Sequence, residues 1–184
     1  KYIKSYLNEC EKIYNLYIYF PFLFANPWTT VLENKKVLVI SPFAETIESQ
    51  YEKRKKLFKD QTVLPQFDLK KIKAYNVLGG VNPYPNISNW FDALEDMKRQ
   101  IDETDFDIAL IGCGAYAFDL AAHVKRKGKK GITLCGGLQT LFGIYGARHE
   151  EEFKKFGILN EYWVGPRSNE RPSGFQNVEN GAYW

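Results

Sequence analysis

The chain has 184 residues and a mass of 21.3 kDa, so a single domain can bury most of its apolar surface without disulfides or a structural metal. Aromatic residues make up 16% of the sequence, which excludes a disordered chain and requires a core, a stacking pocket or a partner surface to cover them. The formal net charge is +3 with both signs well mixed, so no nucleic-acid partner is expected.

The first 30 residues are predicted to form a helix, at residues 2–17, and then an aromatic linker. The apolar run at residues 16–25 is interrupted by Pro21 and is too short to span a bilayer, so no transmembrane segment is expected. The many aromatic side chains suggest that a part ahead of Lys1 covers this segment, or that it joins copies of the chain into a homo-oligomer.

From Lys35 onward, predicted strands and helices alternate. The strands are expected at residues 36–41, 70–77, 107–112 and 131–135, and the helices at 46–58, 89–101 with Ser88 as cap, 117–127 and 136–142. This alternation implies right-handed βαβ units and a parallel sheet covered on both faces. The predicted fold class is therefore α/β, a Rossmann-like three-layer sandwich over residues 31–184 with about four to five mostly parallel strands. An irregular tail is expected from about residue 160.

The most informative stretch is residues 106–116, where an apolar strand runs into a turn that contains Gly112 and Gly114. Because a helix follows, the amides of Gly114, Ala115 and Tyr116 are expected at its N-terminus, where unpaired donors and a partial positive charge suit a phosphate or carboxylate. The glycines would let such a ligand approach the backbone. A Gly-x-Gly pair alone is a weak signal, because the third glycine of the dinucleotide-binding fingerprint is absent.

Ligands of open parallel sheets bind beyond the carboxyl ends of the strands, where the loops that lead into helices gather. These loops are predicted at residues 41–45, 78–80, 112–116 and 135–139, and three of them contain paired glycines. Gly136, Gly137 and Gln139 therefore join residues 112–116 as candidates for ligand binding. The alternative interpretation is that these glycines only close tight turns.

Four side chains near this edge are candidates for chemistry. Ser41 places a hydroxyl at the end of a strand, and Tyr116 could stack on a base or hydrogen-bond to a phosphate. Glu45 could bind a sugar hydroxyl or act as a catalytic base, but a carboxylate in a first turn also stabilises the helix without any function. Arg148 follows a glycine-rich stretch and is the candidate cation for phosphate. In the tail, two further arginines could clamp a phosphate or pair with Glu170, while tryptophans hold the tail on the domain: Arg167, Arg171, Trp163 and Trp184.

No metal site is predicted. Asp105 and Asp107 form an Asp-x-Asp pair, but they precede a strand at the edge away from the expected crevice, so a helix-to-strand turn is the better interpretation. Neither His123 nor His149 has the spacing of a zinc ligand, and no Gly-x-Ser-x-Gly turn offers a serine nucleophile.

The cysteines, Cys10, Cys113 and Cys135, are odd in number, and the last two fall at the ends of apolar strands. Free cysteines in such places are commonly buried, and unpaired thiols are typical of a reducing environment. A cytoplasmic location is therefore expected.

Three blocks of sequence carry a resemblance to a known family: KKVLVISPFAETIESQY at 35–51, FDIALIGCGAYAFDLAAHVKRKGKK at 106–130 and LCGGLQTLFGIYGAR at 134–148, with the closing NGAYW. They resemble an uncharacterised bacterial family that is found with surface-polysaccharide genes. That family is similar to the GT-D type glycosyltransferases, whose Rossmann-like domain transfers a sugar from a nucleotide donor. The step to glycosyl transfer rests on fold-level analogy.

The resemblance implies a nucleotide-sugar donor whose diphosphate lies on the loops at 112–116 and 136–139, with Glu45 and Arg148 facing the sugar or the phosphates. It also implies a glycan acceptor, in the synthesis of a bacterial surface polysaccharide or glycoprotein. The GT-D type enzymes carry an Asp-x-Glu metal motif in the N-terminal half of their catalytic domain, and no such motif precedes the first strand here. On this analogy the chain would be the C-terminal half of a transferase, able to hold a nucleotide but deficient in metal and catalysis. A divalent metal is expected only if an N-terminal part completes the domain.

Two other functions are compatible with the same residues. The crevice could recognise a nucleotide or small anion without catalysis, while the aromatic N-terminal segment docks to a partner. A methyl-transferring or other nucleotide-dependent enzyme could use the same loop.

Overall fold

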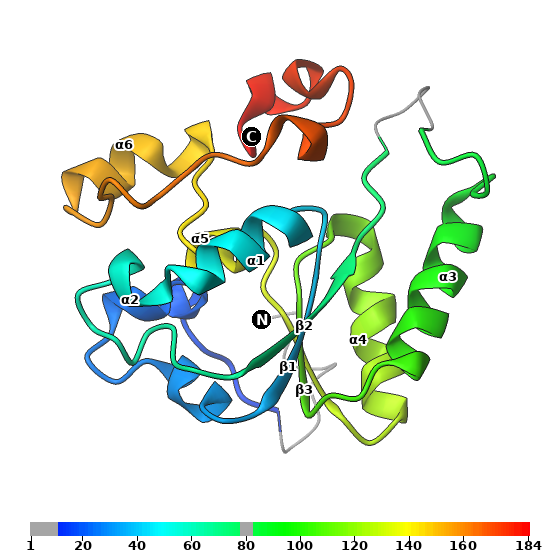
Figure 1. Ribbon diagram of the computed structural model, residues 1–184, viewed down its shortest axis with the longest axis horizontal. Coiled ribbons are helices and arrows are strands. Elements are labelled where there is room, and N and C mark those ends of the chain that lie inside the picture. Colours follow the sequence, from blue (N-terminus) through cyan, green and yellow to red (C-terminus); the bar gives the residue numbers. More distant parts are fainter. Residues whose placement is uncertain (1–10, 78–82) are drawn as a thin grey trace.

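The computed structural model describes residues 11–77 and 83–184. Its centre is a four-stranded sheet of β1 (Lys36–Ser41), β2 (Asp68–Lys73), β3 (Ile108–Ile111) and β4 (Lys130–Thr133), in the spatial order β2-β1-β3-β4. Every neighbouring pair of strands is parallel. Helices cover both faces of the sheet (Figure 1), and the predicted α/β Rossmann-like sandwich is confirmed.

The helices largely follow the predicted alternation. They are α1 (Ala44–Glu52), α2 (Arg54–Leu57), α3 (Trp90–Glu103), α4 (Ala117–Arg126), α5 (Gly137–Leu141) and α6 (Ala147–Lys155). The single helix expected at residues 46–58 is interrupted at Lys53, and α6 was not predicted. The cap of α3 is Asn89 rather than Ser88, because the Asn89 side chain accepts hydrogen bonds from the amides of Phe91 and Asp92.

Alternate residues of β1 build two separate cores. Val37 and Val39 face α1, α2, α5 and α6, whereas Leu38 and Ile40 face α3 and α4. All of β1 after Lys36 is buried, as expected of the strand that lies inside a parallel sheet. Strand β2 lies at an edge and begins and ends earlier than the predicted 70–77, because its pairing with β1 runs from Lys36 opposite Asp68 to Ser41 opposite Lys73.

The N-terminal segment is not the predicted helix in its described part. Residues 11–15 have no regular structure, and short 3₁₀ turns follow at Leu16–Tyr19, Pro21–Leu23 and Trp28–Leu32, while residues 2–10 lie outside the described chain. Part of its aromatic content is covered by the domain itself, since Phe22 stacks on Phe58 and packs edge-on against Trp163. Other side chains stay exposed: Ile13, Tyr14, Leu16, Tyr17, Leu23 and Phe24.

The C-terminal tail lies with α6 over the carboxyl ends of the strands (Figure 1). Trp163 anchors it by donating a hydrogen bond from Nε1 to the Leu57 carbonyl at 3.1 Å. The Glu170 carboxylate is buried against the first turn of α1, where it accepts hydrogen bonds from the amides of Glu45 (2.9 Å) and Thr46 (3.1 Å) and from the Thr46 hydroxyl. The tail therefore supplies the N-terminal cap that α1 lacks in its own sequence.

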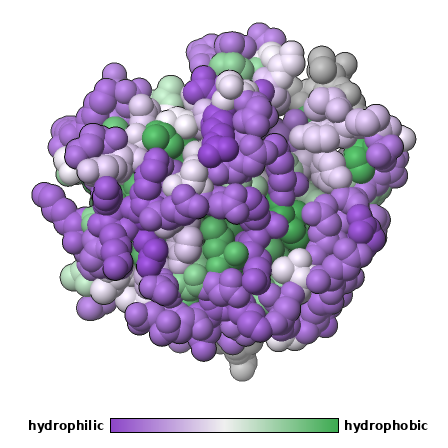
Figure 2. All heavy atoms as spheres, in the orientation of Figure 1, coloured by the Kyte–Doolittle hydropathy of each residue, from purple (hydrophilic) through white to green (hydrophobic). Residues whose placement is uncertain are grey.

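The face of the molecule in Figure 2 is mostly hydrophilic, with hydrophobic atoms only in small areas near its middle and rim. Within the described residues, no helix combines the length and the apolar character needed to cross a membrane.

Replacing Glu170 by alanine should lower the free energy of unfolding by about 1 to 3 kcal/mol, because two amides and a hydroxyl in a buried turn lose their acceptor. Glu170→Gln, which keeps one acceptor oxygen, should cost less. Urea denaturation followed by circular dichroism measures both. The exposed Glu151→Ala in α6 is the control, and a loss for Glu170→Ala no larger than that of the control would contradict the capping role.

Candidate functional site

The order of the strands places a crevice between the carboxyl ends of β1 and β3. The chain leaves β1 toward β2 on one side and later returns to β3 on the other, so the connections after β1 and β3 diverge. Ligands of open parallel sheets bind at such a switch point. A cavity of about 580 Å³ lies here, lined by residues from both strand ends, from the loops after β2 and β4, and from the tail.

Glycines shape one rim of the cavity. A Cβ on Gly112 would lie 2.8 Å from the Cys135 carbonyl oxygen and from Leu138, so only glycine lets the turn after β4 pack against the end of β3. Gly114 has φ +58° and faces open space. Gly136 also faces open space, but with an ordinary φ of −64°. A side chain at Gly136 would therefore project without strain, whereas one at Gly114 would strain the backbone.

The same rim carries unpaired backbone donors. Among the residues that the structure describes, the amides of Gly114 and Ala115 donate no hydrogen bond, and neither do those of Cys135 and Gly136. Two side-chain donors are buried without a described partner as well, Asn76 Nδ2 and Trp184 Nε1, and both residues line the cavity. Buried donors are normally paired, so Asn76 and Trp184 favour a ligand that brings acceptor oxygens. The amides of Gly114, Ala115 and Cys135 belong to exposed residues and are free to donate to the same ligand.

Aromatic side chains form the other walls. Trp90 and Tyr116 stack with ring centroids 5.2 Å apart and an angle of 6° between their planes. Tyr75 donates a hydrogen bond from its hydroxyl to Asp96 at 2.7 Å, and burial together with this bond raises the pKa of Tyr75 to about 12. Tyr183 and Trp184 of the tail complete the lining. Flat faces of this kind suit a planar ring or the apolar face of a sugar.

The described lining contains no charged side chain. Nor do the described residues include any group of three or more histidine, cysteine, aspartate or glutamate side chains that could hold a metal ion. Phosphate at this site would therefore meet backbone and amide donors rather than a cation.

Six of the residues predicted from sequence come together in the cavity lining: Gly112, Gly114, Ala115, Tyr116, Gly136 and Gln139. Gln139 is buried, and its Nε2 lies 3.4 Å from the Tyr183 carbonyl oxygen. The loop at 78–80, also predicted to be near this edge, lies outside the described residues.

Four predicted residues lie outside the lining. Ser41 is buried and its hydroxyl accepts a hydrogen bond from the Phe43 amide, which closes the turn after β1. Gly137 packs against Tyr19, since a Cβ on this glycine would lie 2.9 Å from the Tyr19 side chain, and its amide donates to the Leu134 carbonyl. Arg148 binds the Tyr183 hydroxyl at 2.8 Å and lies 3.6 Å from Glu179.

Glu45, the predicted catalytic base, is the fourth of these residues and is held by other side chains. Lys73 binds its carboxylate at 2.6 Å and Asn169 at 2.9 Å, and these contacts, with the charge of Arg167, lower the pKa of Glu45. A base that works near neutral pH needs a raised rather than a lowered carboxyl pKa. The geometry therefore favours a structural role, joining α1 to β2 and the tail.

The tail arginines form no phosphate clamp in this structure. Arg167 lies 3.9 Å from Glu45, and Arg171 donates to the Pro166 carbonyl. Asp105 and Asp107 lie at the amino edge of the sheet, where both bind Lys36, as the interpretation of a helix-to-strand turn predicts.

Sequence reasoning missed the lining residues that are distant in sequence from the glycine loops: Tyr75, Asn76, Trp90, Tyr183 and Trp184. For the first two a signal existed, because they follow β2 and so must reach the same edge as residues 112–116. The position of the tail has no comparable local signal.

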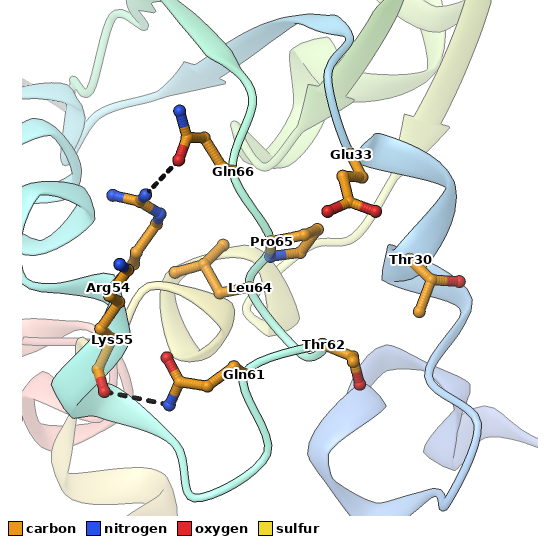
Figure 3. A pocket seen from close by; sticks show the side chains of 9 residues that line it. All are labelled: Thr30, Glu33, Arg54, Lys55, Gln61, Thr62, Leu64, Pro65 and Gln66. Carbon is orange, nitrogen blue, oxygen red and sulfur yellow. Dashed lines mark hydrogen bonds between the residues drawn. The ribbon is translucent and has the colours of Figure 1, made fainter.

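A smaller hollow of about 250 Å³ lies near the starts of β1 and β2 (Figure 3). Arg54 points toward Gln66 and donates to its side-chain oxygen at 2.9 Å, while Glu33 lies on the other side of Pro65. This hollow is at the amino edge of the sheet, away from the switch point, where Glu33 and Lys55 are exposed and Arg54 is half-buried.

Comparison of the chain with protein-family models, with curated proteins and with solved structures finds no match. The relationship to GT-D type glycosyltransferases therefore stays a prediction from the sequence blocks.

Replacement by alanine should have different effects on stability at two glycines of the rim. Gly112→Ala should lower the free energy of unfolding by about 1 to 3 kcal/mol, because the added methyl meets backbone and Leu138 at 2.8 Å. Gly136→Ala should leave stability unchanged or slightly higher, because it has room and an ordinary φ. Urea denaturation distinguishes the two, and equal losses would contradict the described packing of the rim.

Proposed function

We propose that this chain binds a nucleotide-sugar, as a glycosyltransferase or its C-terminal half, in the synthesis of a bacterial surface polysaccharide or glycoprotein. The observation that carries the proposal is the cavity at the switch point, which combines an aromatic lining with a rim of unpaired donors. A nucleotide diphosphate has the matching parts, a planar ring and a chain of acceptor oxygens.

In this proposal the ring lies among the aromatic walls near Trp90 and Tyr116, and the diphosphate lies on the rim. Amides of Gly114, Ala115 and Gly136 would donate to the phosphate oxygens, and the absence of side chains on the glycines would allow the close approach. Backbone donors that hold the leaving diphosphate would also stabilise the negative charge that develops on it during sugar transfer.

A second candidate, a nucleotide- or anion-binding module without catalysis, is favoured by the uncharged lining. A transferase normally activates the acceptor hydroxyl with a base, and no carboxylate or histidine lines the described cavity. Turnover separates the candidates. Release of UDP from UDP-sugars by the full chain, with and without manganese and an acceptor glycan, supports the transferase, whereas UDP binding without release supports the module.

Side chains of increasing size at Gly136 should progressively exclude UDP. Calorimetry with UDP, UDP-sugars and S-adenosylmethionine measures affinity for the natural chain and for Gly136→Ala, Gly136→Val and Gly136→Leu. We expect UDP binding to weaken along the series, by at least about tenfold for leucine, because Gly136 lines the cavity and an added side chain would take up open space beside it.

Thr30→Leu is the matched control for this series, because it adds bulk to the other hollow in Figure 3. It should leave UDP affinity unchanged. Absence of UDP binding, or equal affinity in Gly136→Leu and the natural chain, overturns the proposal; binding of S-adenosylmethionine alone would instead support a methyl-transferring enzyme.

Asn76→Ala should weaken UDP binding about three- to tenfold, the loss expected for one hydrogen bond. Stability without ligand should stay equal or rise, because the change removes a buried donor that has no described partner. This combination separates a ligand-binding role from a structural one. Calorimetry and urea denaturation provide the two measurements, with the exposed Asn26→Ala as control; lower stability with unchanged affinity would contradict the assignment.

A further inference from the structure

Two thiols face the cavity from neighbouring strands. Cys113 follows β3, Cys135 follows β4, both line the cavity, and both are free thiols. The proposed function uses neither of them. Cys10 lies outside the described residues.

The pairing of β3 with β4 brings together the two turns that carry the cysteines. Ile111 and Thr133 are direct partners in the parallel ladder, and each cysteine lies two positions further along its own chain. The pairing continues past this point, because the Leu134 amide donates to the Ile111 carbonyl at 2.8 Å. The Cys135 carbonyl oxygen lies only 2.8 Å from where a Gly112 Cβ would stand. Paired strands are about 4.8 Å apart, so the two turns begin within the Cα separations of about 4.4 to 6.8 Å that disulfides span.

The surroundings of the two thiols differ. Cys113 is buried with 7% exposure, and burial raises the pKa of its thiol to about 12, with a smaller contribution from Cys135. Cys135 is exposed. A dissolved oxidant therefore reaches Cys135 first, and Cys113 stays a protected thiol beside it.

We propose that Cys113 and Cys135 are a site of reversible oxidation, at which a peroxide forms a disulfide in the wall of the cavity. The peroxide oxidises the Cys135 sulfur to a sulfenic acid and is itself reduced, with release of one water. The Cys113 sulfur then displaces the hydroxyl, which leaves with the Cys113 proton as a second water. Two thiols thus give two hydrogens and two electrons to one peroxide, and a dithiol reductant restores them.

Such a bond would join the turn after β3 to the turn after β4. Both turns carry the unpaired amides of the rim, at Gly114 and Gly136 respectively, so oxidation would change the shape of the surface at which a ligand would bind. Disulfides that form transiently in a reducing compartment are commonly of this regulatory kind.

The test uses the full chain with Cys10→Ser, so that the two cavity thiols are the remaining cysteines. The folded, reduced protein is treated with hydrogen peroxide, unreacted thiols are alkylated in denaturant, and intact mass and linked peptides are measured. We expect a product lighter by about 2 Da, without alkylation, that contains a Cys113–Cys135 linkage and is reversed by dithiothreitol. Before oxidation, N-ethylmaleimide should label Cys135 at least about tenfold faster than Cys113.

Cys135→Ser in the same background is the matched variant, because its side chain is exposed and the change should not disturb folding. It should keep Cys113 alkylatable in denaturant after the same treatment. The proposal is overturned if peroxide converts Cys135 to sulfinic acid while Cys113 stays free, if both thiols stay free, or if the linkage joins two copies of the chain. These measurements need no nucleotide, so their outcome does not depend on whether the proposed function is correct.

Discussion

The pairing of β1 with both β2 and β3 is the constraint on which the rest of the structure depends. A strand with parallel neighbours on both sides must be buried on both faces, and β1 meets this demand with the near-continuous apolar run from Val37 to Ile40. Because the ladders are parallel, the chain leaves every strand at the same edge. The glycine turns after β3 and β4, the segment after β2 and the turn into α1 are thereby collected around one crevice.

The C-terminal tail covers one of the helix ends that the sheet brings to this edge. Glu170 lies on the first turn of α1, the position at which a doubly wound fold commonly offers its amides to a ligand. With that turn occupied by the protein's own carboxylate, unpaired donors at the crevice include the amides near the ends of β3 and β4 and the side chains of Asn76 and Trp184. The tail thus occupies the amino end of α1 and leaves free amides at the other loops.

The sequence predicted the fold well wherever a local pattern decides it. Strand β1 was predicted at its observed bounds, and α4 within one residue, because an apolar run and an amphipathic repeat are each visible in a single segment. The interruption at Lys53 and the 3₁₀ turns of residues 16–32 were missed, since both depend on packing against the core rather than on periodicity. The glycine rim was predicted from the glycine pairs together with the topology of a parallel sheet.

The individual side chains of the site were harder to predict. Glu45 and Arg148 carry suitable charges at plausible positions, but Lys73, Asn169 and Tyr183 bind them, and such partners are chosen by contacts between distant segments. Trp90 and Trp184 reach the cavity from α3 and from the tail, nearly a hundred positions apart. No spacing rule relates residues so far separated, so the aromatic walls could be found only in three dimensions.

The placement of the four tryptophans has a practical consequence for spectroscopy. Trp28 and Trp163 pack in the core on the α1 side of the sheet and do not line the cavity. Trp90 and Trp184 line the cavity, and Trp184 also packs against that core. Indole emission depends on its immediate surroundings, so Trp28 and Trp163 would report on the core, and Trp90 and Trp184 would also respond to any ligand in the crevice. A ligand in the crevice would therefore change the emission of two tryptophans and leave the other two as an internal reference, without any added dye.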